Sequence, residues 1–183
     1  MLESFSLLAN IFKGGRHGYG AKLTNIFSKS FTIETVDSNQ RLHYQQTWCD
    51  NMTKSSPPAI TPVGDDVEDY TCVAFVPDMS RLSGHSNSRH IDVQDYAIMC
   101  RRVVDAAGCA AGKLQVFLNG KNVSIYSYAD YSSMYRDDEA PKLCFADINP
   151  RWTVGVGLSS SNSFESVSFV NGMSTPRGGT HVN

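Results

Sequence analysis

The hydrophobic period of this chain changes from helical to extended near residue 30, and this change restricts the fold more than any other feature. Leu23, Ile26 and Phe27 lie at helical spacings and predict a helix over residues 21–28 with one apolar face. After this helix, polar and apolar side chains alternate with a period of two, which predicts strands of an antiparallel sheet. A helix joined to a run of strands indicates the α+β class. This alternation predicts strands over 30–36 and 42–49, and residues 70–76 are predicted as a third strand.

The second half of the chain follows a polar boundary over residues 78–91. Asp92 is predicted to cap an amphipathic helix, whose apolar positions between 93 and 107 pack in a core and which ends at Gly108. The pair Asn119-Gly120 between two apolar runs predicts a tight hairpin. The other expected segments are a short apolar helix over 3–12, a loop over 53–68, a helix over 128–135, and strands over 142–146, 152–158 and 164–170.

Four glycines gather between Gly14 and Gly20, directly before the first predicted helix of the sheet region. Glycine lets the backbone approach a ligand closely and adopt a positive φ, and free amides at a helix N-terminus attract anions. Lys22 adds a positive charge at the same place. The pattern predicts a phosphate-binding loop. A plain glycine turn with a solvated lysine stays an alternative, because the spacing matches neither the P-loop nor the dinucleotide fingerprint.

The composition argues against several classes of protein. The net charge is −2, so no overall basic field points to nucleic acid. The five cysteines contain no closely spaced pair, which predicts no zinc site and is typical of buried thiols in a reducing compartment. The sequence has no run of about 18 apolar residues and predicts no membrane span. The acidic segments Asp65–Asp69 and Asp137–Glu139 are interpreted as solvated loops, because they lack a fixed ligand spacing.

Two motifs near opposite ends of the chain carry a family resemblance. The first reads G-G-R-x-G-Y-G-A-K-L from Gly14, and the second reads S-F-V-N-x-x-x-T-x-x-G-G-x-H-V from Ser168. Between them lie the blocks Q-T-W, E-D-Y-T-C and F-V-P-D, in the family's order. Together these blocks resemble the ATPase region of eukaryotic-type DNA topoisomerase II. The resemblance runs from Gly14 to the last residue.

This resemblance implies two partial domains. Residues 1–78 would be the C-terminal part of a GHKL (Bergerat) ATPase domain with its ATP lid, and residues 79–183 the first part of a ribosomal-protein-S5-like transducer domain. In the whole enzyme, this region binds ATP with Mg²⁺ and couples binding and hydrolysis to the passage of one DNA duplex through another. The expected partners are ATP, double-stranded DNA and a second copy of the enzyme, with no membrane partner. The expected location is the nucleus.

The same resemblance implies which residues line the triphosphate. They are Arg16, His17, Gly18, Tyr19, Gly20, Ala21 and Lys22, with histidine at the position where the family usually has asparagine. The family's helix with a general-base Glu and a Mg²⁺-binding Asn is not found in this sequence, nor is its D-x-G-x-G turn, and its Q-T-K block would lie beyond Asn183. Hydrolysis needs an activated water, a metal and charge neutralisation together. We therefore assign no catalytic residue and no metal ligand here, and expect this chain alone to be inactive although it is part of an ATP-hydrolysing enzyme.

Two other functions stay open at this point. The chain could be a non-catalytic truncated product that acts as an interaction module, for example by binding a full-length partner. It could also be a different GHKL-superfamily ATPase, although the block from Ser168 to Val182 favours topoisomerase II. His181 has no nucleophile partner in the sequence and is interpreted as a structural residue.

Overall fold

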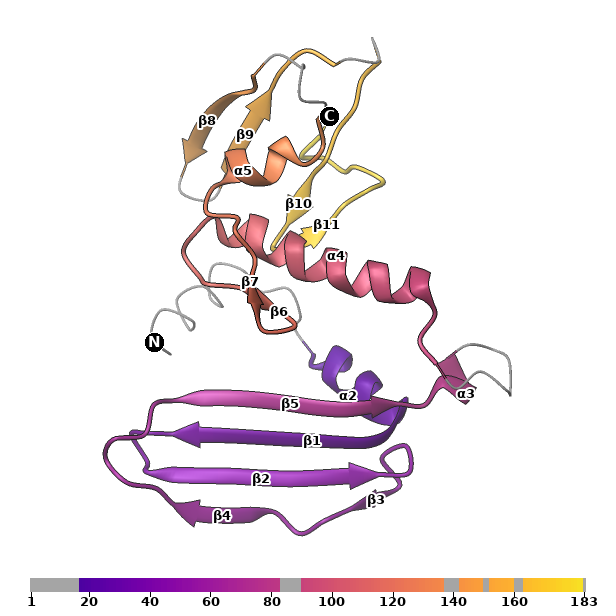
Figure 1. Cartoon of the computed structure of the whole chain (residues 1–183), viewed down its shortest axis with the longest axis vertical. Helices are drawn as coiled ribbons and strands as arrows, with labels where there is room; N and C mark the ends of the chain where they lie inside the picture. Colours follow the sequence, from indigo (N-terminus) through magenta and orange to yellow (C-terminus); the bar gives the residue numbers. More distant parts are fainter. Residues whose placement is uncertain (1–16, 83–89, 137–141, 150–151, 160–162, 183) are drawn as a thin grey trace. The chain divides into compact units, whose positions relative to one another are not determined.

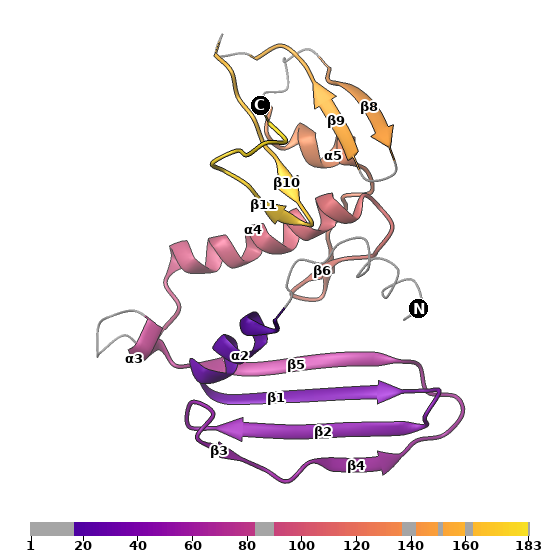
Figure 2. The same ribbon diagram turned by 180° about the vertical axis from the view of Figure 1, so that it is seen from behind.

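A computed structural model describes residues 17–82, 90–136, 142–149, 152–159 and 163–182, and the helix predicted over 3–12 lies outside these ranges. The chain divides into two compact units, Met1–Ile91 and Asp92–Asn183, each of which is described by itself. Figures 1 and 2 show the ribbon from opposite sides. Helices and antiparallel strands occur in both units, which confirms the predicted α+β class.

The first unit is an antiparallel sheet with a short helix at one end (Figure 1). Its three long strands are the three predicted over 30–36, 42–49 and 70–76. The strand order is β3-β2-β1-β5, and β4 pairs with the same side of β2 as β3 does. The elements are α2 (Tyr19–Ile26), β1 (Ser28–Asp37), β2 (Leu42–Cys49), β3 (Lys54–Ser55), β4 (Ala59–Pro62), β5 (Tyr70–Pro77) and α3 (Met79–Leu82).

The two faces of this sheet differ in chemistry, as alternating side chains require. Phe31 is opposite Trp48 on β2 and Phe75 on β5, so three aromatic rings share one face. The ring of Phe31 is buried, whereas Phe75 stays 49% exposed. On the other face, Glu34 of β1 has Gln45 of β2 beside it on one side and strand β5 on the other. The aromatic face therefore buries Phe31, whereas the opposite face is polar around Glu34 but also buries Val36, which is 2% exposed.

The expectation of a loop over residues 53–68 is wrong in part. Strands β3 and β4 lie in this segment, and both pair with the outer side of β2. Pro62 is compatible with this place because an edge strand has one side whose N–H groups need no partner. The Ser- and Pro-rich composition concealed these strands, since they extend an existing edge and carry no alternating pattern of their own.

Within its described residues, the second unit combines two helices with three short antiparallel strand pairs. Asn119 and Gly120, with φ of 51° and 75°, form the two-residue turn of the predicted first hairpin. Asn171 and Gly172 repeat this conformation in the last hairpin. The elements are α4 (Val93–Ala110), β6 (Phe117–Leu118), β7 (Lys121–Asn122), α5 (Tyr128–Ser133), β8 (Cys144–Asn149), β9 (Trp152–Val156), β10 (Phe169–Val170) and β11 (Met173–Ser174).

Helix α4 begins as predicted but ends later. The Asp92 carboxylate accepts hydrogen bonds from the N–H groups of Gln94 and Asp95, at 2.5 and 3.1 Å. Gly108 does not end the helix, which continues to Ala110. A Cβ on Gly108 would lie 2.4 Å from the ring of Tyr131, so glycine is needed there for close packing of α5 on α4. The expected stop is therefore a contact point between two helices.

The core of the second unit forms around the C-terminal half of α4. Ala107, Ile125 and Tyr131 are buried, with Phe169 packed against them. Val93, at the start of the helix, is 84% exposed. The prediction that the whole apolar face of α4 packs in a core is therefore wrong for its N-terminal half.

The five cysteines are free thiols, and none of them is buried. Cys72 and Cys144 are exposed, and the other three are half-buried. The expectation of buried thiols is therefore wrong.

Candidate functional site

The predicted phosphate loop lies at the N-terminus of α2. Gly18 precedes the helix in the left-handed conformation, with φ 67° and ψ 15°, which side chains other than glycine adopt at a cost. No side chain caps this end, and the first turn contains no acidic residue. The first amides of a helix have no acceptor within it. The N–H groups of Tyr19, Gly20 and Ala21 are therefore free of helical partners and attract an anion.

Gly20 has room around it that the protein itself does not use. A Cβ at this position would meet no atom of the described residues within 4 Å, and φ at this position is not in the left-handed region. Neither packing nor backbone conformation therefore requires a glycine here, although glycine weakens a helix by about 1 kcal/mol relative to alanine. A bare backbone that is open to solvent fits the close approach of a phosphate group.

The other predicted site residues surround this turn. Tyr19, Ala21 and Lys22 are exposed on α2, and the Lys22 amide donates to the Gly18 carbonyl at 3.2 Å. The ring of His17 lies 5.6 Å from that of Tyr19, centroid to centroid. Arg16 lies outside the described residues. The structure thus gathers six of the seven predicted residues at one solvent-facing helix end, since they are neighbours in sequence.

Helix α2 is not held by the apolar face that the sequence predicts. Leu23 is 52% exposed and Ile26 37%, whereas two polar residues at the end of the helix, Asn25 and Ser28, are 5% and 1% exposed. The Oδ1 atom of Asn25 has no hydrogen-bond partner among the described residues. The helix is therefore attached at its C-terminal end, and its N-terminal end, with the predicted phosphate loop, projects away from this attachment.

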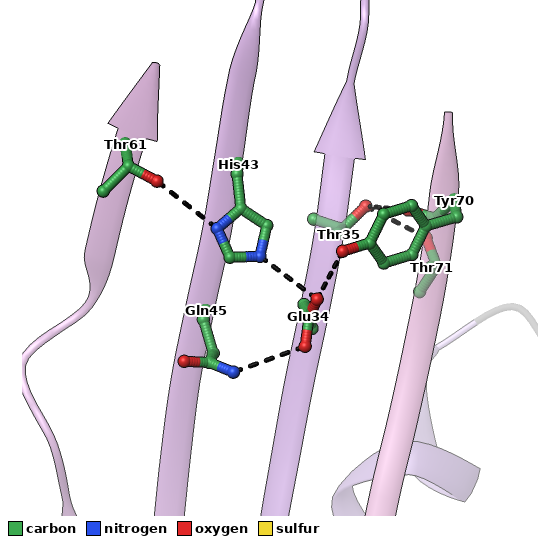
Figure 3. A network of polar contacts seen from close by, with 7 residues as sticks. All are labelled: Glu34, Thr35, His43, Gln45, Thr61, Tyr70 and Thr71. Carbon is green, nitrogen blue, oxygen red and sulfur yellow. Dashed lines mark hydrogen bonds and ion pairs between the residues drawn. The ribbon is translucent and has the colours of Figure 1, made fainter. Parts of the chain in front are cut away.

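A polar network that the sequence did not single out crosses the polar face of the sheet (Figure 3). The Glu34 carboxylate on β1 accepts hydrogen bonds from Tyr70 on β5 and from Gln45 on β2, and it lies 3.3 Å from Nε2 of His43. Nδ1 of His43 is 3.4 Å from the hydroxyl of Thr61 on β4. The Tyr70 hydrogen bond, above all, holds the pKa of Glu34 below its ordinary value. These groups link four strands by their side chains, so we assign them a structural role.

The acidic segment Asp65–Asp69 takes part in loop contacts. Asp65 pairs with Arg41 at 2.8 Å on the surface, and the Asp69 carboxylate accepts the N–H of Ser38. Among the described residues, no group of three or more His, Cys, Asp or Glu side chains is placed to hold a metal ion. The segment Asp137–Glu139 lies outside the described residues.

His181 has hydroxyl partners that sequence spacing did not reveal. Its Nε2 atom lies 3.0 Å from the hydroxyl of Thr175 and 3.3 Å from that of Ser168, and these two hydroxyls are 2.6 Å apart. The contacts tie the last segment of the chain to both ends of the β10–β11 hairpin. They occur in the second of the two motifs and give its Ser, Thr and His a shared structural role.

Along the parts of the chain that the structure describes, no helix combines the length and the apolar character that crossing a bilayer requires.

Curated relatives match almost the whole chain. It is 43% identical to the mitochondrial DNA topoisomerase 2 of Dictyostelium discoideum and 42% identical to DNA topoisomerase 2 of Arabidopsis thaliana. The alignments cover 93% and 92% of this chain, but only 14% and 12% of those two proteins. The chain thus spans a small part of the length of the relatives it matches. No protein-family model matches it.

Solved structures agree with these relatives. The ATPase region of Saccharomyces cerevisiae topoisomerase II matches with a TM-score of 0.81 at 40% identity, over 93% of this chain and 43% of that one. The ATPase and transducer domains of topoisomerase II from Balamuthia mandrillaris match with a TM-score of 0.82 at 45% identity, over 92% of this chain and 42% of that one.

Proposed function

We propose that this chain, which is homologous to the ATPase and transducer region of eukaryotic DNA topoisomerase II, is part of an ATP-dependent type II topoisomerase. Residues 1–78 belong to its ATPase domain and carry the lid, and residues 79–183 belong to its transducer. The partners are ATP, double-stranded DNA and a second copy of the enzyme, and the location is the nucleus. The alignments, which cover more than nine-tenths of the chain at 43% and 42% identity, support this function over that of a separate interaction module.

The contribution of this chain to the reaction is to hold phosphate. The supporting observation is the uncapped N-terminus of α2, where free amides, an open Gly20 and the exposed Lys22 come together. The amides donate hydrogen bonds to phosphate oxygens and the helix dipole favours their negative charge, while Lys22 neutralises part of it. Arg16 and His17, beside the turn in sequence, add further donors.

Mg²⁺, when bound with ATP, would supply further charge neutralisation on the phosphates. We place its ligands, the general base and the adenine contacts in parts of the enzyme other than this chain. The lid residues bind and orient the triphosphate and exclude water from it. None of them abstracts a proton in this proposal.

The test is a titration of the isotope-labelled 183-residue chain with ATP and magnesium, followed by amide chemical shifts. Shifts are expected to centre on Gly18–Lys22. Replacing Lys22 by alanine removes a charge-assisted contact of about 1.5–3 kcal/mol and should weaken apparent binding about tenfold or more. Lys121→Ala is the matched control, because Lys121 is an exposed lysine of the other unit.

A second variant separates binding from folding. Gly20→Ala adds a methyl group to open space, so helix α2 should be at least as stable as in the original chain. The same methyl group should obstruct a phosphate that approaches the backbone, and ATP-induced shifts should shrink. Shifts that centre on Asp65–Asp69 instead, or that survive both substitutions, would argue against the phosphate loop.

A further inference from the structure

The phosphate-binding helix is too short to be stable by itself. Helix α2 has eight residues, and isolated helices shorter than about 12–15 residues are marginal in water. Its apolar side chains Leu23 and Ile26 are exposed and add little stability, whereas Phe27, directly after the helix, is half-buried. Whatever holds its C-terminal end therefore determines where the loop at the other end lies.

That end is held by polar contacts from two distant segments of the same unit. The N–H of Asp78, which follows β5, donates to the carbonyl of Phe27 at 2.7 Å. The N–H of Asn51, which follows β2, donates to the carbonyl of Ser28 at 3.0 Å. The Ser28 hydroxyl in turn donates to the Thr24 carbonyl within the last turn of α2. The end of the helix is thus joined to the ends of two strands.

The side chains of Asp78 and Asn51 join these two segments to each other. Nδ2 of Asn51 donates to Oδ2 of Asp78 at 3.2 Å, and the N–H and hydroxyl of Ser80 donate to Oδ1. Asp78 is only 6% exposed, and Arg81 lies 3.7 Å from its Oδ2 atom. The hydroxyl of Ser80, followed by the amide of Asn51, holds the pKa of this carboxyl below its ordinary value. A buried carboxylate whose donors come from both segments fixes their relative position.

We propose that Asp78 and Asn51 are positioning residues for the phosphate-binding loop, because their hydrogen bond fixes the two strand ends that hold the base of α2. Neither residue touches phosphate. Asn51 suits this role because it has a φ of 59°, a conformation that asparagine and aspartate tolerate better than most residues. The inference rests on the proposed function for the ligand, but the attachment of the helix can be measured without one.

The experiment exchanges the two side chains in the 183-residue chain. Asp78→Asn removes the negative charge and leaves one acceptor oxygen, so its new NH2 group must face the donor of either Asn51 or Ser80. Asn51→Asp places two carboxylates opposite each other. The double variant D78N/N51D restores one donor and one acceptor in reversed order. Thr35→Val is the control, because it removes hydrogen bonds of the same sheet, to Tyr70 and Thr71.

Two quantities are measured under conditions where every variant is folded. Amide exchange at positions 51 and 78 reports the attachment, and the loss of one charge-assisted hydrogen bond should accelerate it about tenfold in each single variant. ATP-induced shifts at Gly18–Lys22 report the loop, and apparent affinity should fall several-fold in the single variants. Both should return to near the original values in the double variant and stay unchanged in Thr35→Val.

The outcomes separate the two proposals. If exchange in the single variants rises no more than in Thr35→Val, or if the double variant does not restore it, the positioning role is wrong. If exchange behaves as expected but ATP shifts no amide of Gly18–Lys22 even in the original chain, the phosphate-binding function is wrong and the attachment stands. If exchange changes but ATP affinity does not, α2 is attached by these residues without their positioning the loop, and the inference fails.

Discussion

Replacing Gly108 by alanine should destabilise the second unit, although alanine is the better helix former. Gly108 lies inside α4, where alanine is favoured over glycine by about 1 kcal/mol. The added Cβ, however, would lie 2.4 Å from two ring carbons of Tyr131 and 2.8 Å from a third. Carbon atoms in favourable contact are about 3.5–4 Å apart, so the ring must move by about 1 Å or more.

The ring of Tyr131 has little freedom to make that movement. It is 2% exposed and contacts the rings of Tyr128 and Phe169. Its hydroxyl donates to the buried carboxylate of Asp105 at 2.7 Å and lies 2.7 Å from the hydroxyl of Tyr135. Forcing extra atoms into such a core costs about 1–3 kcal/mol. After the gain of about 1 kcal/mol in helix propensity, the net loss in the free energy of unfolding should be up to about 2 kcal/mol.

The measurement is urea unfolding of the 183-residue chain, followed by amide exchange within α4. Gly108→Ala should lower the free energy of unfolding of this unit, and Gly20→Ala, the same change at an open position, should not. In a Tyr131→Leu background the penalty of Gly108→Ala should largely disappear, because contacting residues are not additive. If Gly108→Ala stabilises the unit as it would a solvated helix, the close packing of α5 on α4 is refuted.

Two further predictions concern titrating groups. The pKa of Glu34 is lowered, chiefly by the Tyr70 hydroxyl, so its stabilising contribution is present above the unfolded pKa and is lost as pH falls through the lower folded value. The urea midpoint of the first unit should therefore decrease as the pH is lowered below about 4.5, and it should decrease less steeply in Glu34→Gln. An equal dependence of the midpoint on pH in both proteins would contradict this. Burial, followed by the nearby Asp105, raises the pKa of Cys109 to about 11, so its thiol should react with iodoacetamide at pH 8 much more slowly than the exposed Cys72. Mass spectrometry of the labelled sites would show the order, and equal rates would exclude the raised pKa.

The sequence by itself determined the local features of both units. Alternation along residues 30–36 and 42–49 predicted two long strands, residues 70–76 were predicted as a third, and Asp92 predicted the start of α4. Asn119-Gly120 predicted its hairpin. These signals depend on residues that are neighbours in the sequence, so the elements that they predict do not depend on which other segments pack against them. The two terminal motifs likewise led to topoisomerase II, which the relatives confirm.

Only the tertiary structure decided which residues serve as contact points between segments. The sequence predicts Gly108 as a helix stop, but in the structure Gly108 is the position at which the ring of Tyr131 packs against α4. The sequence predicts an apolar helix face that contains Leu23 and Ile26, but these side chains are exposed, and Asn25 and Ser28 are buried instead. Asp78 and Asn51 are 27 residues apart and share no pattern, and their hydrogen bond forms because β2 and β5, on either side of β1, end at the same end of the sheet. The hydrophobic periodicity of the sequence indicates on which face of a helix or strand a side chain lies. It does not indicate which distant element covers that face, because that depends on contacts between residues far apart in the chain.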